Sequence, residues 1–118
     1  MDKALLQLFF PQGLLDYFEL TNYEQREDQY IFYLEEKNLP PKGYRKEDLE
    51  SKGFYNEESV RDFPLRGRPC VLKIKRRKWL HKLDQKIVKR DWNIVAKGTR
   101  MSSEFASFLK EPFGYHTD

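Results

Sequence analysis

The residues best suited to chemistry form one cationic stretch, from residue 61 to residue 100. It holds fourteen lysines and arginines against three aspartates, whereas residues 1–60 carry seven cations against thirteen acids. The whole chain has 118 residues and a formal net charge of +3, so the modest total conceals a polarised molecule. Ammonium and guanidinium groups neutralise phosphates and release their counterions. A polyanion is therefore the first partner to test.

Ten of these cations are candidates for contacts with a nucleic acid. Lysines would neutralise phosphates, and arginines could bind phosphates or base edges through two parallel hydrogen bonds. The candidates are Arg66, Arg68, Lys73, Lys75, Arg76, Arg77, Lys78, Lys89, Arg90 and Arg100. Trp79 and Trp92 could stack on bases, but their positions favour the hydrophobic core. A solvated basic face that pairs with the acidic first half of the chain is a second interpretation of the same charges.

Residues for catalysis or metal binding are sparse. A zinc site needs about four Cys, His or carboxylate ligands, and the chain has one cysteine, Cys70, and two histidines, His81 and His116, without paired spacing. We interpret Cys70 as a small buried residue and His81 as a solvated turn residue. The six glycines are all isolated, so no phosphate-binding loop is predicted. We expect no metal, no cofactor and no enzymatic activity in this chain.

The basic stretch is predicted to form a long antiparallel β-hairpin. Apolar side chains alternate with cations from residue 70 to residue 79, residues 83–86 form the turn, and residues 87–96 return. The apolar underside would consist of Cys70, Leu72, Ile74, Val88, Trp92, Ile94 and Ala96. Such a two-stranded ribbon with a basic top fits the major groove of DNA or lies along its backbone.

A shorter hairpin is predicted ahead of the basic one. Residues 17–21 and 30–34 have the composition of strands, and the polar residues 24–28 link them closely enough for antiparallel pairing. Residues 46–51 favour one helical turn. Residues 66–68 lie between two prolines and are predicted to form a turn rather than part of a central strand.

Short helices are expected at both ends of the chain. Asp2 can cap a first helix that Pro11 stops. Ser102 or Ser103 can cap a last helix that Pro112 limits.

Together these elements predict an α+β fold. A small antiparallel sheet of about four strands, including the long basic hairpin, would be flanked by the short N- and C-terminal helices. Residues 1–111 would form one domain and residues 112–118 a flexible tail. The apolar runs are too short to span a bilayer and no signal-peptide cleavage site is evident, so we expect no membrane association.

Seven motifs follow one another along most of the chain. They are LLQLFFPQGLLDYF at residues 5–18, YLEEKN at 33–38, SKGFY at 51–55, DFPLRG at 62–67, KRRKW at 75–79, VKRDWN at 88–93 and AKGTRM at 96–101. This succession resembles the N-terminal region of a bacterial insertion-sequence transposase family that is encoded as a short separate reading frame. The resemblance covers nearly all of residues 1–111.

The second half is similar, more loosely, to the zinc-ribbon N-terminal region of larger transposases. Residues 95–109 match a segment that precedes their helix-turn-helix, but the paired cysteines, the complete helix-turn-helix and the Asp-Asp-Glu catalytic core are absent from this sequence. The resemblance implies an accessory module that recognises the terminal repeats of double-stranded transposon DNA, beside a separate catalytic subunit. It also implies a bacterial, cytoplasmic and nucleoid-associated protein, and it assigns no base-reading role to any one residue.

A protein-interaction module is the alternative function. The basic face would then dock an acidic partner or the acidic half of a second copy, so a homodimer stays open. An RNA-binding domain would share the charge, but the glycine and aromatic signatures of common RNA-binding modules are missing.

Overall fold

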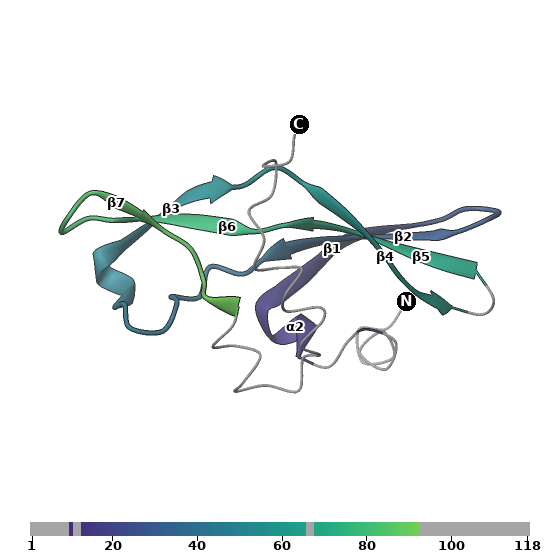
Figure 1. The fold of residues 1–118 in the computed structure, drawn as a ribbon, viewed down its shortest axis with the longest axis horizontal. Coiled ribbons are helices and arrows are strands. Elements are labelled where there is room, and N and C mark those ends of the chain that lie inside the picture. Colours follow the sequence, from purple (N-terminus) through teal and green to yellow (C-terminus); the bar gives the residue numbers. More distant parts are fainter. Residues whose placement is uncertain (1–9, 11–12, 66–67, 93–118) are drawn as a thin grey trace.

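A computed structural model describes residue 10, residues 13–65 and residues 68–92, with the backbone alone for residues 62–65. Two β-sheets lie end to end along its longest axis (Figure 1). The elements in chain order are α2 (Leu14–Tyr17), β1 (Phe18–Gln25), β2 (Tyr30–Glu36), the 3-10 turn η1 (Lys46–Asp48), β3 (Leu49–Phe54), β4 (Glu58–Leu65), β5 (Arg68–Lys75), β6 (Arg77–His81) and β7 (Lys86–Val88).

The first sheet has four strands in the order β1-β2-β5-β4. β1 and β2 form an antiparallel hairpin, and β4 and β5 form another, while β2 and β5 pair in parallel. The two central strands, β2 and β5, each pair with a strand on both edges and contain most of the buried apolar residues of this sheet. The predicted hairpin of residues 17–21 and 30–34 is confirmed, with β1 extending to Gln25.

The second sheet has three antiparallel strands in the order β3-β6-β7. The chain passes from the first sheet into the second at Arg76, between β5 and β6. The strand predicted over residues 70–79 is therefore wrong as one element: its halves belong to different sheets. The predicted turn of residues 83–86 is close to the observed turn at residues 82–85, but the returning strand β7 has only three residues.

The core lies on one face of the four-stranded sheet. Its buried members are Phe10, Leu14, Phe18, Tyr30, Phe32, Leu34, Cys70, Leu72, Ile74 and Trp92. Trp92 stacks on Phe18, with ring centroids 5.4 Å apart, and meets Tyr17 edge to face at 5.7 Å. The alternation of Cys70, Leu72 and Ile74 is thus confirmed, as is the core position of both tryptophans.

The predicted α+β class is wrong, because the described fold is mostly β and consists of two sheets. Its helical elements are α2, with four residues, and η1, with three. The expected terminal helices fall on residues 1–9 and 93–118, outside the described part of the chain. Strand β4 was not predicted, since its Pro64 argues against a strand interior; β4 lies at a sheet edge, where proline is tolerated.

Candidate functional site

The four-stranded sheet has a second face, directed away from the core, which we call the open face. Side chains alternate along each strand, so the neighbours of the core residues in β2 and β5 point to this side. In register across the β2–β5 pair it carries Ile31 beside Val71, Tyr33 beside Lys73, and Glu35 beside Lys75. The open face is therefore where a partner can reach the sheet.

The larger hollow on the open face, which we call the cationic hollow, has a volume of about 490 Å³. It is lined by Arg26, Gln29, Ile31, Tyr33, Ser59, Arg61, Val71 and Lys73. Arg26 follows β1, Arg61 lies on β4 and Lys73 lies on β5, so three segments supply its three cations. No carboxylate is among these described lining residues. Three cations over the apolar floor of Ile31 and Val71 can hold an anion such as a phosphate group.

Glu24 stands beside the cationic hollow and fixes two of its side chains. Its carboxylate accepts a hydrogen bond from the Tyr33 hydroxyl at 2.5 Å, and two more from Nε and Nη2 of Arg26 at 3.1 and 2.8 Å. The hydrogen bond from Tyr33 lowers the pKa of Glu24 most, followed by the hydrogen bonds from Arg26. The bond between Tyr33 and Glu24 also raises the pKa of Tyr33. Glu24 balances part of the charge of Arg26. The other two cations of the hollow, Arg61 and Lys73, are therefore best placed to bind an external anion.

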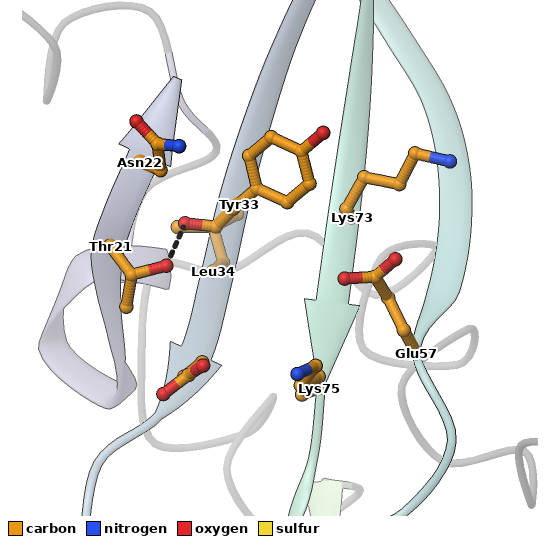
Figure 2. A pocket seen from close by; sticks show the side chains of 8 residues that line it. Thr21, Asn22, Tyr33, Leu34, Glu57, Lys73 and Lys75 are labelled. Atoms are coloured by element: carbon orange, nitrogen blue, oxygen red, sulfur yellow. Dashed lines mark hydrogen bonds between the residues drawn. The ribbon is translucent and has the colours of Figure 1, made fainter. Parts of the chain in front are cut away.

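A smaller hollow of about 160 Å³ adjoins the first one, and the two share Tyr33 and Lys73. It is lined by Thr21, Asn22, Tyr33, Leu34, Glu35, Glu57, Lys73 and Lys75, as Figure 2 shows. The hydroxyl of Thr21 donates a hydrogen bond to the Tyr33 carbonyl at 3.3 Å. With two carboxylates and two ammonium groups, this hollow is electrically balanced. The cationic hollow, in contrast, has three cations and no carboxylate among its described lining residues.

Three of the predicted nucleic-acid contacts lie in or near the first sheet. Lys73 and Lys75 are on the open face and are partly exposed. Arg68 instead braces the β1–β2 turn, because its Nη1 donates to the Arg26 carbonyl at 3.1 Å and its guanidinium lies 5.5 Å from the ring centroid of Tyr30.

Four other predicted contacts lie away from this sheet face or outside the described structure. Lys89 is exposed beyond β7, and the ammonium group of Lys78 lies over the ring of Tyr55 at 5.3 Å. Arg66 and Arg100 are outside the described residues.

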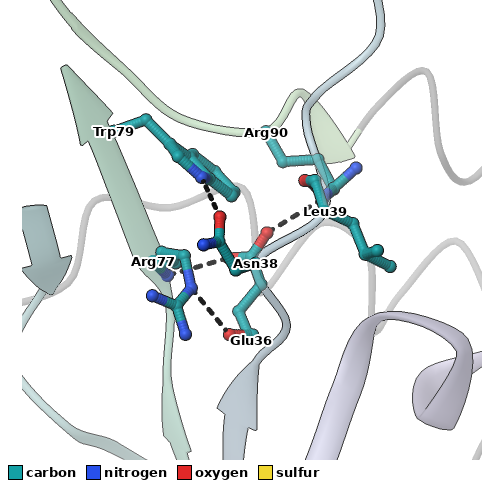
Figure 3. A network of polar contacts seen from close by, with 6 residues as sticks. All are labelled: Glu36, Asn38, Leu39, Arg77, Trp79 and Arg90. Carbon is teal, nitrogen blue, oxygen red and sulfur yellow. Dashed lines mark hydrogen bonds and ion pairs between the residues drawn. The ribbon is translucent and has the colours of Figure 1, made fainter. Parts of the chain in front are cut away.

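The remaining three predicted residues are Arg76, Arg77 and Arg90. Arg77 and Arg90 lie beside Glu36 in a cluster that we call the joint (Figure 3), and the charge of the neighbouring Arg76 also acts on Glu36. Nε of Arg90 donates to Oε2 of Glu36 at 2.9 Å, and the backbone N–H of Arg77 donates to Oε1 at 2.9 Å. The side-chain Nε of Arg77 reaches the Glu36 carbonyl at 3.1 Å. The joint thus ties the end of β2 to the start of β6.

Aromatic rings complete the joint. The Arg90 guanidinium lies 4.9 Å from the ring centroid of Tyr17 and within 6 Å of Trp79 and Trp92. Nε1 of Trp79 donates to Oδ1 of Asn38 at 2.8 Å, so the indole N–H is satisfied.

Burial separates the joint from the open face. The exposed fractions are 1% for Glu36, 2% for Arg76 and 7% for Arg90. Desolvation raises the pKa of Glu36, opposed by the hydrogen bonds from Arg90 and Arg77, and it lowers the pKa of Arg76. Guanidinium groups enclosed in this way hold the sheets together and are poorly placed to contact a nucleic acid.

Sequence reasoning did not select two cations of the hollow, Arg26 and Arg61. Arg26 stands in an acidic connection, and Arg61 precedes a proline-containing segment that was not predicted to be a strand. Only the strand register indicates the position of Arg61. Because residues 58–61 pair with β5, Arg61 lies opposite Val71, on the same face of the sheet as Lys73.

None of the protein-family models, curated proteins and solved structures compared with the chain matches it. The resemblance to transposase N-terminal regions therefore stays a prediction. Within residue 10, residues 13–65 and residues 68–92, no helix is long and apolar enough to cross a membrane, and no cluster of His, Cys, Asp and Glu is arranged to hold a metal ion.

Proposed function

We propose that this chain is a DNA-binding module without catalysis of its own, and that it holds the phosphate backbone on the open face. The observation that carries this proposal is the cationic hollow, in which Arg26, Arg61 and Lys73 meet without a carboxylate among the described lining residues. Neutralising phosphates with such cations yields affinity that falls steeply with salt.

The hollow suits backbone contacts better than base reading. Its cations surround a low apolar floor, and Tyr33, Ser59 and Gln29 add polar groups at the rim. Contacts of this kind fix the position of a protein on a duplex and carry no sequence information directly. The proposal thus moves the DNA-binding surface from the predicted basic hairpin, which does not exist as one element, to the open face.

The wider role in the proposal rests on the sequence resemblance. An accessory module of an insertion-sequence transposase would bind the terminal repeats of the element in the bacterial nucleoid and leave catalysis to a separate subunit. Equal affinity for terminal-repeat and unrelated duplexes would exclude end recognition but leave backbone binding in place.

A titration of labelled duplex DNA over a salt series tests the proposal. The double variant Arg61→Glu/Lys73→Glu should lower affinity about ten-fold or more at moderate salt, and it should reduce the slope of log affinity against log salt by about 0.9 for each phosphate that the variant no longer neutralises. The control is Lys42→Glu/Lys46→Glu, an identical charge change at exposed residues of the loop and turn before β3. Equal reductions of affinity in the two double variants would sink the proposal.

Docking of an acidic protein or a second copy is the competing function, since the same cations would serve it. Light scattering at low and high salt distinguishes the self-docking version. A dimer that dissociates with salt, together with no binding of duplex at low salt, would favour the competing function.

A further inference from the structure

The turn between β6 and β7, which we call the tip, presents aliphatic side chains to solvent. Leu83 is 73% exposed and Ile87 is 53% exposed, and they are the most exposed large hydrophobic residues in the described structure. Figure 1 places the tip at one end of the long axis and the β1–β2 turn, beside the cationic hollow, at the other. The cationic hollow and the tip are therefore separate surfaces.

The tip is held in one conformation by its own hydrogen bonds. The backbone N–H of Gln85, a residue with a φ of 62°, donates to the His81 carbonyl at 2.8 Å, and its Nε2 donates to the Lys82 carbonyl at 2.9 Å. Oδ1 of Asp84 accepts from the Lys86 N–H at 3.1 Å and lies 3.0 Å from Nδ1 of His81. Leu83 is thus presented by an ordered turn.

The η1 turn and the loop before it support the tip. The Lys82 N–H donates to the Asp48 carbonyl at 2.9 Å, and the rings of His81 and Tyr44 meet edge to face at 5.1 Å. His81 was predicted to be solvated, but only 16% of its side chain is exposed. A single exposed apolar side chain is common on protein surfaces, but here two of them, Leu83 and Ile87, belong to one ordered and supported hairpin and can meet a partner together.

Cations frame the apolar side chains. Lys82, Lys86 and Lys89 are all exposed, and the one acid of the turn, Asp84, is engaged within it. The complementary partner is therefore apolar at its centre and anionic at its edges. A base step of duplex DNA between its two phosphate strands has this chemistry, and proteins that kink DNA insert Leu or Ile side chains there.

We propose that the tip is a wedge, in which Leu83 enters between two base pairs and the flanking lysines contact the adjacent phosphates. This inference rests on the proposed DNA binding and adds to it a kink in the bound duplex. An anionic membrane has similar chemistry, but two aliphatic side chains bury less apolar area than one fatty acyl chain, which by itself anchors proteins only marginally.

The test uses the full chain with duplexes that carry 2-aminopurine at successive positions, together with a pair of end-attached dyes that report bending. The wild type should raise 2-aminopurine fluorescence at a base step and bring the duplex ends closer. Leu83→Ser should lose most of both signals while affinity falls less than about ten-fold. Leu83→Phe, which keeps an apolar wedge, should retain them.

Leu39→Ser is the matched control, because Leu39 is also exposed, at 44%, but lies in the loop after β2. It should behave as the wild type does. Wild-type protein that binds duplex without unstacking or bending it overturns the wedge and leaves the proposed function standing. Absence of duplex binding overturns both. Binding to vesicles of anionic lipid that depends on Leu83, without DNA unstacking, would assign the tip to a membrane and overturn the wedge.

Discussion

The open face and the joint use the same kinds of side chain for opposite purposes. On the open face, Arg61 and Lys73 border a hollow of about 490 Å³ that solvent can enter. At the joint, the Arg90 side chain and the Arg77 backbone N–H donate to one buried carboxylate, that of Glu36, while the Arg77 side chain donates to the Glu36 carbonyl and aromatic rings lie around Arg90. Counting cations in the sequence cannot separate the buried cations from the exposed ones, because burial at the joint depends on a carboxylate from another strand.

The contrast teaches that local charge excess overstates the binding surface. A buried guanidinium group that lacks a partner destabilises the fold. The arginines of the joint are therefore engaged in contacts within the protein and are not available to a ligand. The open face keeps cations that the fold does not need. Changes at the joint should therefore affect stability, and changes at the open face should affect binding.

The largest effect is expected at the joint. Arg90→Leu should lower the free energy of unfolding by about 3–5 kcal/mol, because it leaves the carboxylate of Glu36 buried without its main partner. Urea denaturation measures this change. Arg61→Leu removes an exposed cation and should change the same quantity by no more than about 0.5 kcal/mol. Equal costs for the two variants would remove the distinction between the regions.

A second change disturbs the second sheet, away from the open face, without altering charge. Gly53 has a φ of +86°, at the register shift between Ser51 and Phe54 where β3 pairs with β6. No atom lies within 4 Å of a Cβ built there, so Gly53→Ala should cost about 1 kcal/mol from backbone strain alone. Thermal unfolding checks this value. The affinity of Gly53→Ala for duplex DNA should match that of the wild type. A loss of binding would contradict the separation of the two regions.

The smallest effect concerns the carboxylate of the open face. Folding lowers the pKa of Glu24 below its ordinary value of 4.5, so Glu24 stabilises the fold above that pH and loses this contribution as the pH falls through its folded pKa. Glu24→Gln should therefore show a slightly flatter fall in unfolding temperature between about pH 6 and pH 3. Glu27→Gln, in the neighbouring turn, is the control. An unchanged profile in Glu24→Gln would argue against its bonds to Tyr33 and Arg26.

The elements that could be predicted are those encoded locally. The composition of residues 30–34 and the short polar link after β1 led to the right hairpin, and the alternation in residues 70–74 led to the right core face. The end of one strand and the start of the next at Arg76 could not be predicted from local alternation, because residues 75–78 are all cationic. This break depends on Glu36, which is 41 residues away in sequence from Arg77.

The candidate site was predicted in part for the same reason. Lys73 and Lys75 were identified from their own strand, whose period of two is visible in the sequence. Arg26 and Arg61 reach the hollow through strand pairing, so their role follows from topology. The parallel pairing of β2 with β5 brings Tyr33 next to Lys73, and no local pattern indicates that pairing.

Chemical-shift mapping with a short DNA duplex tests most directly the claim that the open face binds a polyanion and the joint does not. In a titration of labelled protein, the backbone and side-chain N–H signals of Arg26, Arg61 and Lys73 should shift progressively, and those of Arg77 and Arg90 should stay in place. Raising the salt concentration should reverse the shifts. Shifts centred on Arg77 and Arg90, with the open face unchanged, would contradict the claim.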